Sequence, residues 1–115
     1  MANEQKPDQK SSTGLDANIA GLICYLIGPF AIIFFVIEKD SKFVKFHAMQ
    51  SLMLSVAIIV IFTVLTFIPI IGWIIEILLS FVILGLWVYL MYKAFSGEMY
   101  KLPYIGDMAE KQVNK

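Results

Sequence analysis

The chain has 115 residues, of which 59% are hydrophobic and only 16% are charged. A soluble domain of this size has too small a core for so many apolar residues, so the composition excludes an ordinary water-soluble protein and indicates an integral membrane protein. Nine lysines balance nine acidic residues, and a net charge of +0 leaves no overall positive field for nucleic acid. Nucleic acid is therefore not an expected partner.

Residues 1–15 form a polar leader, rich in Lys, Gln and Ser, with little to bury, which predicts a disordered segment. The leader is polar for longer than the basic region of a cleavable signal peptide, so no such peptide is expected. Asp16 or Asn18 can cap the following helix by accepting a hydrogen bond from an amide of its first turn.

The first membrane span is predicted over residues 19–37, which carry no charge and are long enough, at about 1.5 Å per residue, to cross a hydrocarbon layer of roughly 30 Å. Ala20, Cys24 and Gly28 lie four residues apart and form a stripe of small side chains that lets another helix approach closely. Gly28 and Pro29 interrupt this helix and predict a kink or a local break. The break is either a tolerated kink or a functional hinge.

A charged segment, residues 38–51, separates the first two apolar runs, and we call it the elbow. Within it, Lys42 and Lys45 alternate with Phe43 and Phe46. This pattern is typical of a membrane surface, where Phe enters the acyl boundary while Lys reaches the phosphates. The elbow is therefore predicted to be the amphipathic start of the second membrane helix, in contact with lipids. A sensor of lipid surfaces is one reading of the two lysines.

The second span is predicted over residues 48–68, with Ser41 as the N-cap of its helix. His47, Gln50 and Ser51 lie three and four residues apart on one side, which we expect to point inward because lipid offers no hydrogen-bond partners. Two interpretations remain open. The three side chains either bond to neighbouring turns at an interfacial helix start, or form a proton-responsive or ligand-binding site, since imidazole titrates near neutral pH.

The third span is predicted over residues 72–91, and the apolar turn over residues 69–72 makes it an antiparallel hairpin with the second span. Glu76 is a carboxylate in this span, and at the membrane centre it would cost about 2.5 to 3.5 kcal/mol. Because it lies one turn into the span, it is either structural and close to the interface or a site for an ion or substrate. In the second case, these residues would face the bundle: Glu76, Ser80, Ile83 and Trp87.

Gly97 can end the third helix, because glycine readily adopts the left-handed conformation that follows a helix. A short surface helix is predicted over residues 107–111. The chain is thus divided into the leader, a transmembrane domain over residues 16–96, and a tail over residues 97–115.

The distribution of lysines predicts an orientation. With three full crossings, the leader and the 69–72 turn share one side and hold Lys6 and Lys10. The elbow, the exit of the third span at Lys93 and the tail share the other side and hold the other seven of the nine lysines. Positive residues favour the cytoplasmic side of a membrane. The elbow and the C-terminus are therefore expected in the cytoplasm, the N-terminus outside, and the protein in the cell membrane.

No motif for catalysis is present: the chain has no Gly-rich phosphate loop, no HExxH, no GxSxG and no pair of catalytic carboxylates. The single cysteine, Cys24, excludes an internal disulfide and a Cys-based zinc site, and we interpret it and Tyr25 as packing residues. His47 has no second ligand or triad partner nearby in the sequence. We therefore expect no enzyme activity, no catalytic residue, no metal and no cofactor.

Three stretches resemble a known family: IEKDSKFVKFHAMQS, FIPIIGW and KAFSGEMYKLPYIGDMAEK. They are similar to small, largely uncharacterised prokaryotic membrane proteins with a domain of unknown function, and the resemblance covers roughly residues 18–111. That family is in turn distantly similar to the small polytopic subunit of the chloroplast inner-envelope protein-import translocon. The chloroplast relatives are expected to have four spans, whereas the leader here is too polar for a fourth. The resemblance implies a multi-pass membrane protein and transfers no catalytic residue.

The expected architecture is an all-α bundle of three transmembrane helices, with the second and third as a hairpin. Three spans enclose almost no interior, which predicts a homo-oligomer or docking on another membrane protein through the small-residue stripe and the face of His47, Gln50 and Ser51. Two function classes follow. One is a structural or interaction subunit or assembly factor; the other is a small transport or pore-forming homo-oligomer with a polar path through His47, Gln50 and Glu76.

Overall fold

The structure is a computed structural model that describes residues 10–113. The leader is predicted to be disordered over residues 1–15, and residues 1–9 of it lie outside the described residues, while within the rest Ser11 and Ser12 bond to Glu38. The described helices are α1 Ala17–Ile27, the 3₁₀ helix η2 Gly28–Ala31, α2 Ile32–Ile37, α3 Lys42–Thr66, α4 Ile71–Phe95 and α5 Ile105–Val113. Three helical segments are long and apolar enough to cross a membrane: Ala17–Ile37, Lys42–Thr66 and Ile71–Phe95. The predicted all-α membrane bundle with three such segments is confirmed.

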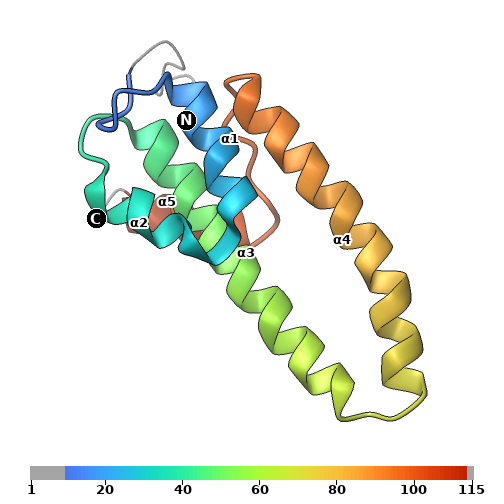
Figure 1. The fold of residues 1–115 in the computed structure, drawn as a ribbon. Helices are drawn as coiled ribbons and strands as arrows, with labels where there is room; N and C mark the ends of the chain where they lie inside the picture. The colour runs from blue at the N-terminus through green and yellow to red at the C-terminus, as the bar shows by residue number, and fades with distance from the viewer. Residues whose placement is uncertain (1–9, 114–115) are drawn as a thin grey trace.

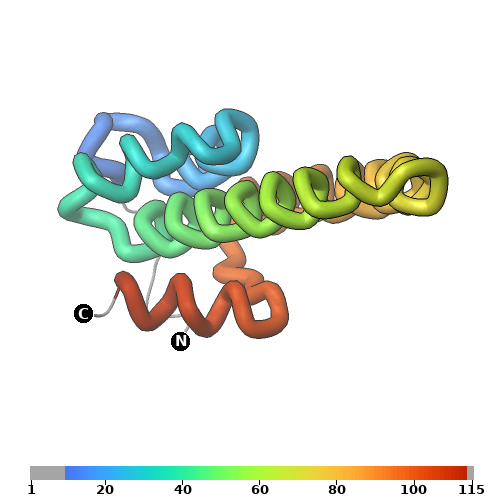
Figure 2. Tube along the Cα trace, turned by 90° about the horizontal axis from the view of Figure 1, so that it is seen from below, coloured from blue at the N-terminus to red at the C-terminus, as the bar shows by residue number. Residues whose placement is uncertain are grey.

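The longest elements, α3 and α4, form an antiparallel hairpin that gives the molecule its elongated shape (Figure 1). α1 packs against both of them, at the end of the hairpin where α3 begins and α4 ends. Seen from below, α1 and α2 lie on one side of α3, and α5 lies on the other (Figure 2). The far half of the hairpin has no other described helix beside it (Figure 1).

The turn between α3 and α4 is as tight and apolar as the sequence predicts. Ile70 has a φ of 65°, and the backbone turns back so sharply that a Cβ on Gly72 would lie 2.0 Å from the carbonyl oxygen of Leu65. Only glycine fits there, because any side chain would overlap the end of α3. Gly97, with a φ of 84°, ends the α4 region as predicted.

The predicted cap of α1 is wrong. The Asp16 side chain makes no cap hydrogen bond and instead pairs with Lys10, at 2.9 Å. Asn18 reaches across to the end of α4, where its amide donates to the carbonyl oxygen of Phe95 at 3.0 Å. Both side chains therefore find partners distant from the first turn of α1.

The elbow begins α3 as predicted, with the Ser41 hydroxyl accepting a hydrogen bond from the Val44 amide at 3.2 Å. However, Phe43 and Phe46 are fully buried, so the prediction that they enter the acyl boundary is wrong. The physical reason is that α1 and α2 fold over one side of the elbow and α5 over the other, which turns both rings into core residues. Lys42 stays exposed.

Lys45, the other predicted lipid contact of the elbow, is partly covered. Its ammonium lies 4.8 Å from the centre of the Phe35 ring, a cation–π contact with α2. Its aliphatic chain therefore packs on protein as well as reaching the surface.

The first apolar segment is broken rather than kinked. At Gly28 the backbone has φ 61° and ψ −123°, a conformation open to glycine, and Pro29 follows at the start of η2. α1 therefore ends after 11 residues, and α2 runs in a new direction over α3 (Figure 1). The predicted local break is present, and it changes the direction of the chain.

The residues that flank the first apolar segment, Ala17–Ile37, are in contact with each other. The Ser12 amide donates to Glu38 Oε2 at 2.8 Å, and the Ser12 hydroxyl accepts from the Lys39 amide at 2.7 Å. The Ser11 hydroxyl and the Ser41 amide also donate to the Glu38 carboxylate, the latter at 2.9 Å. We call Ser11, Ser12, Glu38 and Ser41 the Glu38 cluster. A straight helix over the same 21 residues would separate these ends by about 30 Å.

The pKa of Glu38 reflects this cluster. Burial alone would raise the pKa of the carboxyl group, but hydrogen bonds from the Ser11 hydroxyl, the Ser12 amide and the Ser41 amide outweigh it and lower the pKa below its ordinary value. Glu38 is therefore ionised at neutral pH although it is almost fully buried.

Replacing Glu38 by Gln should destabilise the protein at neutral pH by about 2 kcal/mol, because an amide cannot accept from all of these donors. The pKa of Glu38 is lower in the folded protein than in the unfolded chain. The stabilisation by the Glu38 carboxylate is therefore complete above the unfolded pKa and is lost as the pH falls through the folded pKa. Thermal unfolding in detergent, followed by circular dichroism from neutral to acidic pH, should show the two proteins converging at low pH.

The control is Asp40→Asn, which removes an exposed charge from the same loop. Equal stability of Glu38→Gln and the wild type at neutral pH would contradict the role of the Glu38 cluster.

Candidate functional site

The polar face of α3 points into the protein. His47, Gln50 and Ser51 have exposed fractions of 0%, 0% and 2%. They face α1 and the segment that follows α4, so their inward orientation agrees with the pattern in the sequence. The site is therefore defined by what these three side chains bind inside the chain.

His47 is bonded at both ring nitrogens. Nε2 lies 2.8 Å from the carbonyl oxygen of Glu98, which can only accept, so Nε2 carries the proton and donates. In the neutral ring, Nδ1 is then an acceptor, and the Tyr25 hydroxyl donates to it at 2.7 Å. Neither nitrogen is left for a metal ion or for proton transfer to a ligand.

Gln50 continues the same chain of hydrogen bonds. Its Nε2 donates to the Tyr25 hydroxyl at 2.7 Å and to the carbonyl oxygen of Tyr100 at 2.9 Å, while its Oε1 accepts from the Leu102 amide at 2.9 Å. The amide thus binds the backbone on both sides of residue 101, much as a neighbouring strand would. Among the described residues, no buried side-chain nitrogen or oxygen lacks a hydrogen-bond partner.

Ser51 bonds backbone carbonyl oxygens at the break in the first apolar segment. Its hydroxyl donates to the carbonyl oxygen of Cys24 at 2.8 Å and lies 3.3 Å from that of Gly28. Trp87 on α4 adds a third bond, from its indole nitrogen to the carbonyl oxygen of Tyr25 at 2.6 Å. Pro29 has no amide to offer the carbonyl oxygen of Tyr25, so the Trp87 indole supplies a bond that the break removes, and Ser51 adds a side-chain bond at the end of α1.

Apolar groups enclose the polar side chains tightly. The rings of Tyr25, Phe43 and Phe46 meet His47 edge to face, with ring centres 5.3, 4.7 and 5.2 Å from the imidazole. A Cβ on Gly21 would lie 3.1 Å from the Phe43 ring. This packing encloses the imidazole between three aromatic rings and fixes its position.

The small-residue stripe is used within the chain. Ala20 and Cys24 are fully buried in a cluster with Phe43, Val44 and Ala48 of α3. Gly28 is partly buried, and a Cβ there would lie 3.4 Å from the Ser55 hydroxyl. The stripe therefore lets α3 approach α1, and Ala20 and Cys24 are not available to a second copy in this arrangement.

Glu76 lies at the other end of the hairpin. Its carboxylate accepts a hydrogen bond from the Thr66 hydroxyl at 3.0 Å, next to the turn between α3 and α4. His47 and Thr66 are both on α3, and at about 1.5 Å per residue they are separated by roughly 28 Å. The structure therefore brings His47, Gln50 and Ser51 together but leaves Glu76 far from them.

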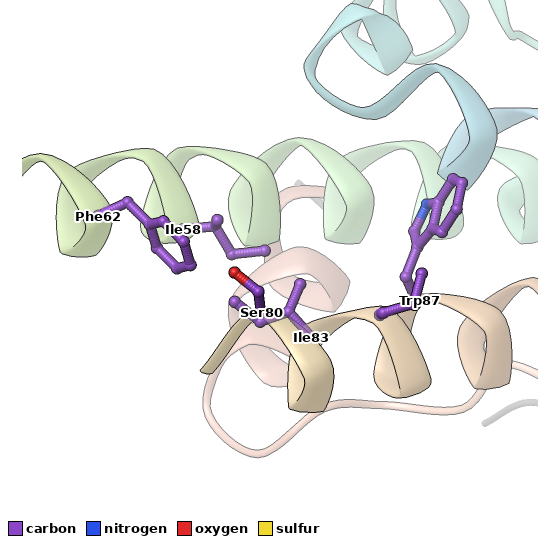
Figure 3. Close-up of a pocket in the computed structure, with 6 residues that line it drawn as sticks. Ile58, Phe62, Ser80, Ile83 and Trp87 are labelled. Atoms are coloured by element: carbon purple, nitrogen blue, oxygen red, sulfur yellow. The ribbon is translucent and has the colours of Figure 1, made fainter. Parts of the chain in front are cut away.

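Three of the α4 residues that were predicted to face the bundle, Ser80, Ile83 and Trp87, do face α3. Ser80, Ile83 and Trp87 line an apolar pocket of about 280 Å³ between the two helices, opposite Ile58 and Phe62 (Figure 3). Among the described residues, no group of three or more His, Cys, Asp or Glu side chains could hold a metal ion.

Tyr25 is the central residue that the sequence interpretation treated only as packing. Its hydroxyl joins His47 to Gln50, and its carbonyl oxygen binds Trp87. One signal in the sequence could have identified it: a tyrosine in the middle of an apolar span needs a partner for its hydroxyl. Nothing in the sequence indicated that the partners would include backbone atoms of the tail.

Replacing Gln50 by Leu should release the tail from α3, because the Leu102 amide and the Tyr100 carbonyl would lose buried partners at about 1 to 3 kcal/mol each. Hydrogen exchange of residues 98–113 in detergent should accelerate, and limited proteolysis should cut there first. The control Thr63→Val removes an exposed hydroxyl that bonds only within α3. Unchanged protection of the tail in Gln50→Leu would contradict this role.

Comparison with known proteins agrees with the membrane fold. A UPF0132 membrane protein of Methanocaldococcus jannaschii is 50% identical over 103 residues, which cover 89% of this chain and 93% of the relative. One of Archaeoglobus fulgidus is 44% identical over 97 residues, covering 84% and 94%. No solved structure matches the chain.

These relatives confirm the predicted resemblance to a small membrane protein family of unknown function. Residues 13–109, nearly all of the described chain, match a single family. The protein belongs to the magnetosome magnetite crystal formation protein family.

Proposed function

We propose that this multi-pass membrane protein is a structural or interaction subunit, or an assembly factor, that acts as a homo-oligomer or within a larger membrane complex. The supporting observation is that the polar side chains bind within the chain: His47, Gln50 and Ser51 are buried and hydrogen-bonded to groups of their own chain. Their bonds fix the position of helices and tail, and they offer nothing to a substrate.

The fixed tail gives the protein a defined polar surface. α5 packs on α3 through Ala109, next to Phe46 and Met49. Its other side carries Asp107 and Lys111, both exposed. A charged helix packed beside a membrane bundle suits binding to another protein better than catalysis.

The exposed side of α4 is the contact surface we propose for a second copy or another membrane protein. Phe81, Val82 and Val88 are 72%, 65% and 51% exposed, and Gly85 lies among them. A Cβ on Gly85 would meet no atom within 4 Å, so packing within this chain does not require glycine there. Close approach of a helix from another molecule would require a glycine at this position.

A pore-forming homo-oligomer is the alternative, and the arrangement of a single chain gives it little support. His47 and Gln50 are enclosed, and Glu76 bonds to Thr66 at the far end of the hairpin. A lipid-surface sensor would rest on Lys42, which is exposed, since Lys45 is partly covered by Phe35. Charge reversal at Lys42, with orientation checked, tests that class.

The location we propose is the cell membrane, with the elbow and the C-terminal tail in the cytoplasm, because lysines favour that side. The distant resemblance to the chloroplast translocon subunit is compatible with an interaction subunit and stays a prediction. A protein-import role would require a partner that binds the exposed surfaces of α4 or α5.

Replacing Gly85 by Leu should reduce assembly several-fold without unfolding the chain. Leucine favours a helix more than glycine does, and the added side chain meets open space in the monomer. The oligomeric state and co-purifying proteins, measured after extraction into native lipid discs, should shift toward the free monomer.

Val60→Leu is the matched control, because it adds volume on the exposed side of α3. Assembly that survives Gly85→Leu unchanged would contradict this interface, and a wild-type monomer without partners would contradict the proposed function.

Replacing Glu76 by Gln separates the two function classes. A structural role predicts the same oligomer size and the same phenotype, because Gln still accepts the hydrogen bond from Thr66. A transport role predicts lost ion or solute flux in reconstituted vesicles with the assembly intact. Loss of flux in Glu76→Gln would therefore favour the pore.

A further inference from the structure

We propose that Ala17–Ile37 is a re-entrant helical hairpin, which enters the membrane and returns to the face where it began. In this arrangement only α3 and α4 cross the bilayer completely. The residues before α1, the elbow and the tail then all lie on one face of the membrane. This inference rests on the contacts of the first segment and does not depend on the proposed function.

The first argument is length. α1 has 11 residues and α2 has 6, so at about 1.5 Å per residue they extend roughly 16 and 9 Å. Neither spans a hydrocarbon layer of about 30 Å. The two helices could cross together only if they continued in one direction, and the break at Gly28 prevents this.

The second argument is where the segment begins and ends. Ser12, before α1, bonds to Glu38, Lys39 and Asp40, after α2, at distances of 2.7 to 3.1 Å. These groups are in direct contact, so they occupy the same depth and the same side of the membrane. A polar cluster with an ionised carboxylate also belongs at a membrane surface.

The third argument is how the turn can lie within lipid. Broken helices are tolerated at membrane depth only where other groups bond the freed backbone. Here Pro29 offers no amide to the carbonyl oxygen of Tyr25, and the Trp87 indole bonds it, while Ser51 bonds the carbonyl oxygen of Cys24. The outer side of the turn is apolar, with Phe30 and Val36 each 67% exposed, which suits contact with acyl chains.

The fourth argument is charge. In the described chain, every lysine lies before α1, in the elbow, at the end of α4 or in the tail, which are the parts that the re-entrant arrangement places on one face. The turn from Phe67 to Ile70, on the other face, has no charged residue. All described lysines then obey the positive-inside rule, including Lys10. This replaces the prediction from the sequence that the N-terminus lies outside.

Cysteine labelling tests the arrangement in the full chain. In a Cys24→Ala background, the single variants Leu15→Cys, Lys39→Cys, Lys111→Cys and Phe67→Cys each place a thiol at an exposed position. A membrane-impermeant maleimide is added to sealed right-side-out vesicles and to inverted vesicles. We expect the first three variants to be labelled only in inverted vesicles and Phe67→Cys only in right-side-out vesicles.

Labelling of Leu15→Cys from the same side as Phe67→Cys, and opposite to Lys39→Cys, would overturn the proposal. A second measurement covers the case in which Leu15→Cys does not accumulate. Epitope tags at both ends of the otherwise unaltered chain are exposed to protease in the same two kinds of vesicle. Digestion of both tags from one side supports the re-entrant arrangement, and digestion from opposite sides overturns it.

Discussion

The fold depends on one constraint: inside a membrane, a backbone carbonyl released by a helix break must be bonded by another group. Pro29, which has no amide, creates that demand at the carbonyl oxygen of Tyr25, and Trp87 of α4 meets it. Ser51 of α3 bonds the carbonyl oxygens of Cys24 and Gly28 beside the break. The donors come from two different helices, so their bonds tie the end of α1 to both α3 and α4. Ala20 and Cys24 of α1 pack on α3 beside these bonds.

The same face of α3 also positions the tail. His47 lies one helical turn before Ser51 and Gln50 directly before it, and both bond the segment after α4 as well as Tyr25 of α1. Tyr25 joins the two sets of bonds, because its hydroxyl lies between His47 and Gln50 while its carbonyl oxygen binds Trp87. A single polar stripe on α3 thus holds both α1 and the segment after α4 against α3.

The sequence allowed the helices, the hairpin turn, the Ser41 cap and the inward face of His47, Gln50 and Ser51 to be predicted, because each depends on neighbours within a few residues. The burial of Phe43 and Phe46 was not predictable in this way. An alternation of Lys and Phe has the same appearance at a lipid surface and under a covering helix, and only the return of α2 and the position of α5 distinguish the two. The bonds between Glu38 and Ser12 likewise join residues far apart in sequence.

The contacts between the polar site and the tail have a consequence for variation among relatives. His47 and Gln50 bind the carbonyl oxygens of Glu98 and Tyr100 and the amide of Leu102, all of them backbone atoms. The side chains at positions 98 and 100 are not what the site recognises. Leu102 and Ala109 are buried and must keep their packing, whereas exposed positions such as Asp107 and Lys111 can change their chemistry while the tail keeps its place beside the membrane helices.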